Sequence, residues 1–599
     1  MPNADAKRAQ SHFRRATVID GWLDGGRSPS RHRTERRHRE RITPAPLLSI
    51  LLIQPLLAIQ GFAQTVPNAG QTLQTMPAPP LPPSTRTPAT AIPETEANRV
   101  ESGTPTSQRI FVKRLRVTGA RLLATEVLES LVEDAAGKSL SLAELEDRAA
   151  RITRYYRDRG YLLSRAYVPQ QDIRDGEVQI AVLEARYGRV QLSNDSRLDD
   201  AKAQAFLAPL QSQAPIAADA LQRQLLLLDE LHGVAVTSTF KPGSSTGTSD
   251  LDVRLSPRPL LSGSLSLNNY GARSTGVWRA GANFNVANAL HQGELFTFNF
   301  MGLRPDLRYG QALVQWPLGG NGWGVGASYS RLDYQLGDSF ESLGASGIAQ
   351  VGELWLDKAL VRSLDERANF QLSYADKKLH DVIDASNSDG HKQIHAWSAR
   401  LSGNRLDRWK GGGATAYSLN LTVGQLGLDA GQAAVDQSDT GHRTEGRFTK
   451  LNGSLARQQA FGDSLSGFVS SMVQRSSANL DSAEKLPLGG PTAVRAYPVG
   501  EASCDDAWLV SLELRYQPSK FPGWQMFAFA DMARGKVNHA PNPGDTGNDR
   551  HLSGLGVGTR WAYDSSFSVE AFAAWRTSSE PISDTDRKPR LWLQAATFF

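Results

Sequence analysis

Residues 293–302 read GELFTFNFMG, and this pattern decides how the C-terminal half of the chain folds. Its phenylalanines, from Phe296 to Phe300, fall on one face of an extended chain, and Thr297 and Asn299 fall on the other. Alternation of apolar and polar side chains predicts a β-strand between two different surroundings. A soluble sandwich alternates in the same way, so this stretch alone leaves a sandwich and a membrane barrel open.

The same alternation continues from residue 259 to the C-terminus, without a helical period. Comparable stretches are LSGSLSLNNYG (261–271), GWGVGASYSRLDY (322–334), ATAYSLNLTVGQ (414–425), FSVEAFAAW (567–575) and RLWLQAATFF (590–599). Of the 12 tryptophans, 11 lie at or beyond Trp278, as expected if only this half carries aromatic girdles at two membrane interfaces. About 20 residues per strand and connection gives about 16 strands. We therefore predict a transmembrane β-barrel over 259–599.

The last stretch places one set of alternating side chains on a single face, and the chain ends on that face. This set is Leu591, Leu593, Ala595, Thr597 and Phe599. A final strand that ends in phenylalanine is typical of bacterial outer-membrane barrels. It indicates contact with lipid and with the machinery that assembles such barrels.

Two small α+β modules are predicted ahead of the barrel, at 109–187 and 188–258. The first combines the strand IFVKRLRVTGA, a helix capped by Ser141 and Glu144, and the strands YLLSRAYVP and GEVQIAVLEARYG. The second repeats the plan with RVQLS, a helix near 198–210, the helix ADALQRQLLLLDELHG, and the strands VAVTSTFKPG and DLDVRLSPR. We interpret its four consecutive leucines as core residues.

The N-terminal segment is predicted to direct export. Residues 1–42 hold 11 Lys and Arg against 5 Asp and Glu, so the excess of +6 exceeds the net charge of +5 of the whole chain. An apolar run then ends in Gly-Phe-Ala, which predicts an extended signal peptide over 1–63 with cleavage after Ala63. A transmembrane anchor is the alternative, but Gln54, Pro55 and Gln60 interrupt the run. Residues 64–108 are rich in Pro, Thr, Ala and Ser, which predicts an extended linker.

Composition and motifs argue against several other classes of protein. Because the basic excess lies in the leader, nucleic-acid binding loses its main support. A nucleic-acid or localisation patch at RHRTERRHRER (31–41) is the alternative, but the apolar run that follows it favours an export signal. GDSF (337–340), GDSL (462–465) and DTGH (439–442) resemble pieces of a lipase, but they lie between alternating strands. AAGKS (135–139) lacks the first glycine of a phosphate loop. No metal spacing is visible, and the single Cys504 excludes an intramolecular disulfide. We predict no catalytic site, cofactor or metal.

Five stretches together resemble the TpsB transporters of two-partner secretion, relatives of the haemolysin and filamentous-haemagglutinin exporters. They are YYRDRGYLLSRAYVPQQDIRDGEVQIAVLEARYG (155–188), NNYGARSTGVWRAGANF (268–284), FTKLNGSLARQQ (448–459), NLDSAEKLPLGGPTAVRAYPVGE (479–501) and FAFADMARG (527–535). The resemblance implies two periplasmic POTRA domains and a 16-stranded barrel in the bacterial outer membrane. It also implies export of a large unfolded TpsA-type exoprotein that carries an N-terminal secretion domain. The alternative is an assembly factor of the same superfamily that inserts other proteins.

The resemblance also implies a functional contact inside the barrel. In the family, an arginine at the tip of a lumenal loop faces an aspartate on the barrel wall. The loop motif matches Val494, Arg495, Ala496 and Tyr497 within a loop expected at 484–507, with Ala496 in place of glycine. The wall motif matches Phe529, Asp531 and Ala533, with Ala533 in place of glycine. Parity independently places these three wall residues on one face of a strand.

Overall fold

The computed structural model describes residues 66–80, 109–304 and 306–599. The predicted signal peptide at 1–63 lies outside the described residues. Within the described ranges, no helix is long and apolar enough to cross a membrane.

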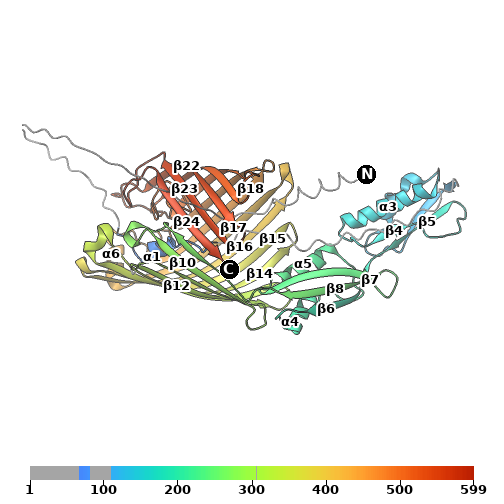
Figure 1. The fold of residues 1–599 in the computed structure, drawn as a ribbon, viewed down its shortest axis with the longest axis horizontal. Coiled ribbons are helices and arrows are strands. Elements are labelled where there is room, and N and C mark those ends of the chain that lie inside the picture. Colours follow the sequence, from blue (N-terminus) through green and yellow to red (C-terminus); the bar gives the residue numbers. More distant parts are fainter. Residues whose placement is uncertain (1–65, 81–108, 305) are drawn as a thin grey trace, which may run out of the picture.

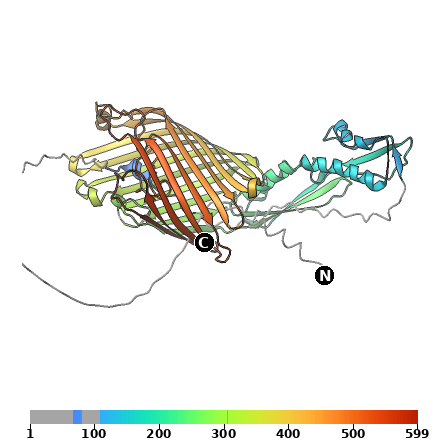
Figure 2. The same cartoon turned by 90° about the horizontal axis from the view of Figure 1, so that it is seen from above.

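Sixteen antiparallel strands close into one barrel, which occupies one end of the molecule in Figures 1 and 2. Each strand pairs with its neighbours in sequence, and β24 pairs with β9 to complete the ring. The strands are β9 (Leu261–Asn268), β10 (Arg279–Ala287), β11 (Leu295–Gly302), β12 (Leu307–Leu318), β13 (Trp323–Gln335), β14 (Ala345–Arg362), β15 (Glu366–Ile383), β16 (Ser388–Asp407), β17 (Gly413–Leu428), β18 (Gly446–Ala460), β19 (Leu465–Ser476), β20 (Asp506–Tyr516), β21 (Trp524–Lys536), β22 (Asp549–Tyr563), β23 (Phe567–Arg576) and β24 (Arg590–Phe598). The predicted barrel of about 16 strands is confirmed.

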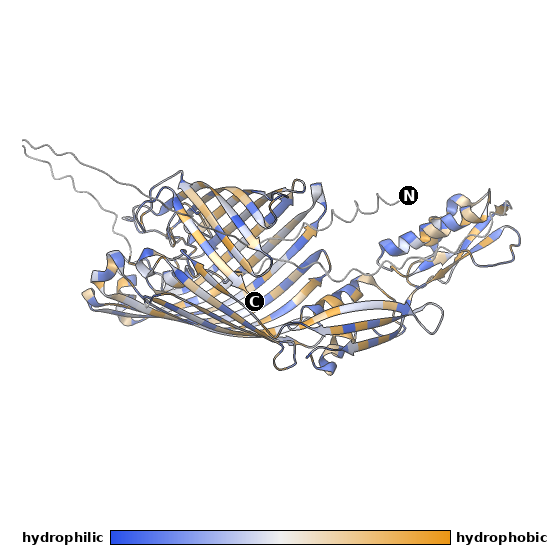
Figure 3. Cartoon of the chain, in the orientation of Figure 1, coloured by the Kyte–Doolittle hydropathy of each residue, from blue (hydrophilic) through white to orange (hydrophobic). Residues whose placement is uncertain are grey.

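Alternation along each strand separates the outer wall from the lumen, and Figure 3 shows it as alternating hydropathy. On β11, Phe298 and Phe300 are exposed on the outside, with 37% and 52% of their surface accessible. Between them, Asn299 faces the lumen, where its amide donates to Gln311 on β12 at 2.9 Å. The outer wall is therefore apolar, and polar side chains on the inner wall form hydrogen bonds with one another, as expected for a membrane barrel.

The first module packs two helices against a short sheet. β2 (Arg114–Thr118), β5 (Glu177–Leu183) and β4 (Arg165–Tyr167) form this sheet in that order, and β1 (Ile110–Val112) pairs separately with β3 (Lys138–Leu140). The helices are α2 (Thr125–Ser130) and α3 (Leu142–Asp158). Ser141 and Glu144 form the predicted capping box at the start of α3. One face of α3 is buried in the module core.

The second module repeats the plan with β6 (Arg186–Asn194), α4 (Asp200–Leu207), α5 (Ala218–Asp229), β7 (Val234–Pro242) and β8 (Thr248–Pro257). All four leucines at 225–228 are buried, as interpreted. The predicted boundary between residues 187 and 188 is wrong because it falls inside β6. Gly188 does not end a strand. It marks a register shift where a Cβ would lie 2.1 Å from Asp250 Oδ1.

The second module docks on the end of the barrel nearest to it, as Figure 1 shows for α5 and β14. Arg223 on α5 donates to the carbonyl oxygens of Leu360 at 3.1 Å and Ala359 at 2.9 Å. Arg362 Nε donates to Glu230 Oε2 at 2.7 Å. We call this the near end of the barrel and the opposite end the far end.

A short helix inside the barrel departs from the expected linker at 64–108. α1 (Ala69–Gln74) lies within the lumen in Figure 1, where the Ala69 amide donates to Asp381 Oδ1 on β15 at 2.7 Å. The expectation of an extended chain is therefore wrong for these residues. The side chain of Asn68 caps the start of the helix. The helix ends at Gln74, before the next proline, Pro77. At Gly70, a Cβ would lie 2.4 Å from Ser482 Oγ, so only glycine fits there.

Candidate functional site

The loop at 477–505 joins the far ends of β19 and β20 and folds back into the lumen. We call it the lumenal loop. The prediction placed it at 484–507, but it starts earlier and ends before Asp506, the first residue of β20. Leu486 and Cys504 exchange backbone hydrogen bonds of 2.8 and 2.9 Å, which hold its two limbs together.

Glycines let the tip of the lumenal loop turn tightly. A Cβ at Gly489 would lie 2.5 Å from the carbonyl oxygen of Pro498. Gly490 has a φ of +129°, a conformation that other residues rarely adopt. Val494 then donates its amide to Leu488 O at 2.9 Å and is fully buried. The backbone on both sides of Arg495 is thus fixed before its side chain makes any contact.

Arg495 reaches the wall formed by β20 and β21. Its Nε and Nη2 donate to the two oxygens of Asp531 at 2.9 and 2.7 Å. Its backbone amide donates to Asp531 Oδ2 at 3.0 Å, and its carbonyl accepts from Trp592 Nε1 at 2.7 Å. Nη1 donates to Glu513 at 2.5 Å and Nη2 to Ser511 at 2.8 Å. A bidentate, almost fully buried pair of this kind is among the strongest polar contacts that side chains make.

Glu513 extends the contact into a network across the inner wall. Its Oε2 accepts from Arg515 Nε at 2.8 Å and lies 3.4 Å from Arg560 Nη1. Arg560 Nε in turn donates to Glu570 on β23 at 2.7 Å. Together with Arg495 and Asp531, three cations and three carboxylates face one another, so the network is balanced in charge.

Phenylalanine rings support the guanidinium groups of this network. The Arg495 guanidinium lies 3.5 Å from the centroid of the Phe529 ring, and Arg560 lies 4.2 Å from that of Phe527. Phe529 also meets Phe572 edge to face at 6.0 Å. Cation–π contacts are stronger where the partners are desolvated. The wall motif therefore contributes a ring as well as a carboxylate.

The two alanines that replace glycine are both buried, with 3% exposure for Ala496 and 0% for Ala533. Ala496 fits because its neighbour on β22 is Gly554. A Cβ on Gly554 would lie 2.5 Å from the Ala496 Cβ. The close approach between loop and wall survives because the wall, rather than the loop, supplies the glycine at this point.

The lumenal loop also holds the loop that follows β23. The Tyr497 hydroxyl donates to Ser579 O at 2.6 Å. Glu501 accepts from Arg550 on β22 at 2.5 Å and from the Ser583 amide at 2.9 Å. Tyr497, the fourth residue of the loop motif, therefore helps to hold the far-end loop between β23 and β24 in place.

A second set of ion pairs holds the first limb of the lumenal loop. Glu484 is 2% exposed and pairs with Lys377 on β15 at 2.6 Å and Lys450 on β18 at 2.7 Å. Asp481 pairs with Lys392 on β16 at 2.9 Å. The loop is therefore fixed to two separate parts of the wall.

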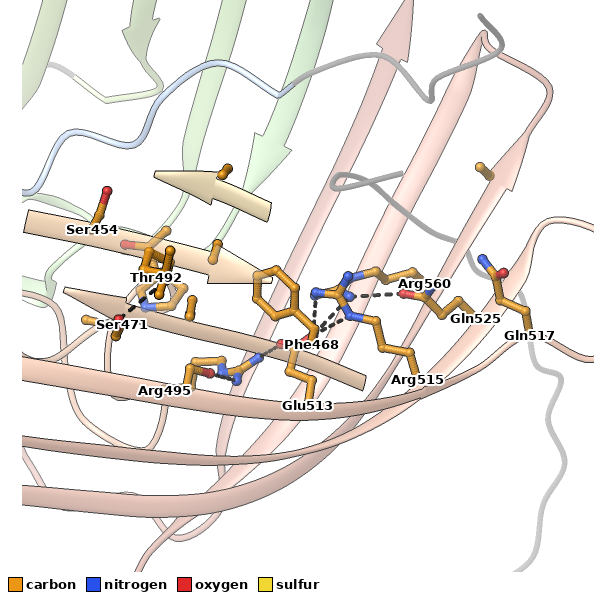
Figure 4. A pocket seen from close by; sticks show the side chains of 18 of the residues that line it. Ser454, Phe468, Ser471, Thr492, Arg495, Glu513, Arg515, Gln517, Gln525 and Arg560 are labelled. Atoms are coloured by element: carbon orange, nitrogen blue, oxygen red, sulfur yellow. Dashed lines mark hydrogen bonds and ion pairs between the residues drawn. The ribbon is translucent and has the colours of Figure 1, made fainter. Parts of the chain in front are cut away.

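Below the loop tip, a cavity of about 900 Å³ extends toward the turn between β20 and β21 at the near end. Figure 4 shows Arg495, Glu513, Arg515 and Arg560 on its wall, with Phe468 among them. The side chains that line it are mostly polar or small. The cavity lies between the tip of the lumenal loop and this near-end turn.

The comparisons with known proteins agree with this architecture. A family model described as haemolysin secretion/activation protein ShlB/FhaC/HecB matches residues 247–561, more than half of the chain. The chain belongs to this family. A second model, a POTRA domain of ShlB type, matches residues 110–185. The protein is thus an outer-membrane transporter of two-partner secretion, with its POTRA domains in the periplasm and the far end of its barrel at the cell surface. The family match favours this exporter over the assembly factor.

Curated relatives cover most of the transporter. The heme/hemopexin transporter protein HuxB of Haemophilus influenzae is 24% identical over 491 residues, which cover 80% of this chain and 85% of that protein. The outer membrane transporter CdiB of Escherichia coli O6:K15:H31 is 23% identical over 421 residues, covering 69% and 70%.

Solved structures share the fold. CdiB from Escherichia coli superposes with a TM-score of 0.66 at 20% identity, covering 89% of this chain and 96% of that one. CdiB from Acinetobacter baumannii gives 0.61 at 16% identity, covering 88% and 96%.

The family resemblance implied that Arg495 faces Asp531, with Phe529 in the same wall motif, and the structure places both wall residues in contact with Arg495. The sequence motifs did not include the other four charged members of the network, Glu513, Arg515, Arg560 and Glu570. One signal was available for Glu513. In the strand VSLELRY (510–516), Ser511, Glu513 and Arg515 share the polar face, so the regular alternation places this carboxylate and its neighbouring cation on the lumenal side.

Proposed function

We propose that the two POTRA domains bind the unfolded exoprotein in the periplasm and that displacement of the lumenal loop opens its path outward. This proposal rests on one observation: inside a closed barrel, buried ion pairs of Glu484 and of Arg495 hold the lumenal loop against the wall at two places. In this position the loop lies in the lumen that an exported polypeptide crosses. We therefore propose that loop displacement is a step of export.

The POTRA sheets offer strand edges that suit an extended polypeptide. Among the described residues, β2 and β4 form the edges of the first sheet, and β6 and β7 those of the second. An unfolded chain adds to such an edge through main-chain hydrogen bonds, which requires little sequence specificity. We infer that the N-terminal secretion domain of a TpsA-type exoprotein binds in this way.

Two further partners follow from the outer wall of the barrel. The exposed apolar side chains of β24 suit outer-membrane lipid, and Phe599 is 54% exposed beside the closing strand pair. We infer that this terminal side chain is the contact for the barrel assembly machinery. Export itself draws no energy from a nucleotide here; folding of the exoprotein outside the cell would bias the direction of movement.

Deletion of residues 109–257 tests the role assigned to the POTRA domains. The variant should insert as a heat-modifiable barrel, while an exoprotein encoded beside the transporter stays in the periplasm when both are expressed together. Insertion of the variant into the outer membrane, checked by fractionation, is the necessary control. Export at the wild-type level would refute the proposal.

A further inference from the structure

Three side chains on the outer wall, at the far end of β15 and β16, form a cluster unrelated to the lumenal loop. His380 on β15 and His391 on β16 are directly opposite each other in the strand register. Asp389 precedes His391 by two residues, so it points to the same face. Gly390, between them, faces the opposite way, where a Cβ would lie 1.7 Å from Gln432 of α6 (Ala430–Asp436).

The cluster lies outside the hydrocarbon layer. Three pairs further down the same face, Tyr374 is opposite Trp397, with ring centroids 5.1 Å apart. Trp397 is 57% exposed, as expected for the aromatic girdle at the membrane interface. His380 and His391 are beyond this girdle, on the side of the cell surface. Their accessibility to ions from the medium follows from this position.

The three side chains already face one another. His380 Nε2 lies 2.7 Å from Asp389 Oδ1, and His391 Nδ1 lies 3.6 Å from the same oxygen. The two imidazole rings are stacked with centroids 4.1 Å apart. One ligand atom from each residue falls within 4.8 Å of the others. Ligands bound to one Zn²⁺ at about 2.0–2.1 Å lie about 3–4 Å from one another, so small side-chain rotations suffice.

The chemistry of this set selects a class of ion. Imidazole nitrogen with one carboxylate oxygen suits Zn²⁺ and similar first-row divalent metals, whereas Mg²⁺ and Ca²⁺ prefer oxygen ligands alone. Lys378, which lies on this face of β15, pairs with Asp376, with 3.9 Å between Nζ and Oδ2. Lys392 points into the lumen, where it pairs with Asp481.

We propose that His380, Asp389 and His391 form a binding site for a divalent transition metal such as Zn²⁺ at the cell surface. Three protein ligands leave a fourth position open to solvent. Metal binding there adds a side-chain link between two strands that are already paired, and it is independent of the export pathway through the lumen. No metal spacing is visible in the linear sequence because the site forms only when the two strands pair.

The test uses the full-length transporter, purified in detergent with a tag other than polyhistidine and stripped with a chelator. Titration with Zn²⁺ alone should show one site per chain with a dissociation constant in the micromolar range. His391→Gln and Asp389→Asn should each weaken binding by about tenfold or more. Binding of Co²⁺ should give visible absorption bands of a nitrogen- and oxygen-ligated ion, and these bands should be absent in His391→Gln.

His395→Gln is the matched control. His395 is exposed on the same face and pairs with Asp376 at 3.2 Å, but its cross-strand partner is that carboxylate rather than a second histidine. This variant should bind Zn²⁺ like the wild type. The proposal is overturned if the wild type shows no saturable binding below millimolar Zn²⁺, or if His391→Gln binds as tightly as the wild type. Heat-modifiability of each variant establishes that its barrel is folded.

Discussion

Arg495 donates to both oxygens of Asp531 and, through its remaining nitrogen, to Glu513, so one loop side chain joins two adjacent strands of the wall. The two carboxylates differ in what else they contact. Glu513 has two other arginines beside it, at Arg515 and Arg560, whereas Ser511 is the other side-chain donor to Asp531. Loss of Arg495 therefore leaves Asp531 with the greater deficit, because Glu513 keeps cationic neighbours.

Alanine substitution of Arg495 or Asp531 should sharply reduce export without preventing barrel insertion. Removing one member of a buried ion pair typically costs about 3–5 kcal/mol, because the other charge loses its partner. This cost falls on the position of the loop rather than on the strand ladder. The double variant should export little less than either single variant, since contacting residues are not additive. Export is measured as exoprotein in the medium, and insertion as the heat-modifiable band.

Arg534→Ala is the control for this pair of variants. Arg534 is on the same strand as Asp531, but its side chain is 64% exposed and 3.7 Å from an equally exposed Asp549. Exposed pairs contribute little, so export should be unchanged. If the losses in the Arg495→Ala and Asp531→Ala single variants multiply in the double variant, or if either exports normally, Arg495 has no role in holding the loop.

Gly554→Ala should displace the tip of the lumenal loop. The new methyl group would lie 2.5 Å from the Ala496 Cβ, a separation that real side chains do not tolerate. Export should fall, and Ala496→Gly in the same chain should restore most of it by removing the opposing methyl. Restoration is expected to be incomplete because the new Cβ also lies 3.1 Å from Trp575 O.

Gly352→Ala serves as the control for the glycine substitution. This position on β14 has no atom within 4 Å of an added Cβ, so export should remain normal. A double variant no better than Gly554→Ala alone would show that contact with Ala496 is not the reason for the defect.

Glu484→Gln should loosen the other fixed point of the loop. The substitution removes the charge that two buried ammonium groups share, at Lys377 and Lys450, and leaves both without a counter-ion. We expect a larger mean conductance in planar bilayers than for the wild type, because the first limb no longer stays against the wall. Glu580→Gln, whose side chain is 77% exposed in a far-end loop, should conduct like the wild type. Equal conductance of Glu484→Gln and wild type would mean that this ion pair does not restrain the loop.

The alternating pattern predicted the barrel because lipid and lumen impose opposite demands on successive residues. The same parity placed Phe529, Asp531 and Ala533 on the inner face, where the structure has them buried. Contacts that depend on strand register could not be foreseen. Glu570 on β23 meets Arg560 on β22 only because the ladder pairs these two positions. The proline-rich composition around α1 likewise hid a helix that is held by wall residues such as Asp381, more than 300 positions away.

The outer edge of β7 gives the most specific test of exoprotein binding. The Val236 amide donates to Asp229 Oδ1 at 3.1 Å, so it points away from β8. Amides alternate in direction along a strand, so that of Ser238 also points away from β8 and is free of the β7–β8 ladder. Ser238→Pro removes this donor from the edge, a position where sheets tolerate proline.

Export by Ser238→Pro should fall severalfold if the exoprotein pairs with β7, because each main-chain hydrogen bond contributes about 0.5–1.5 kcal/mol. Ser238→Ala keeps the amide and should export like the wild type, which separates the edge donor from the side chain. Limited proteolysis of the periplasmic part establishes that the second POTRA domain is folded in both variants. Equal export by the two variants would exclude β7 and direct attention to the opposite edge of the same sheet, β6, which lies two strands away.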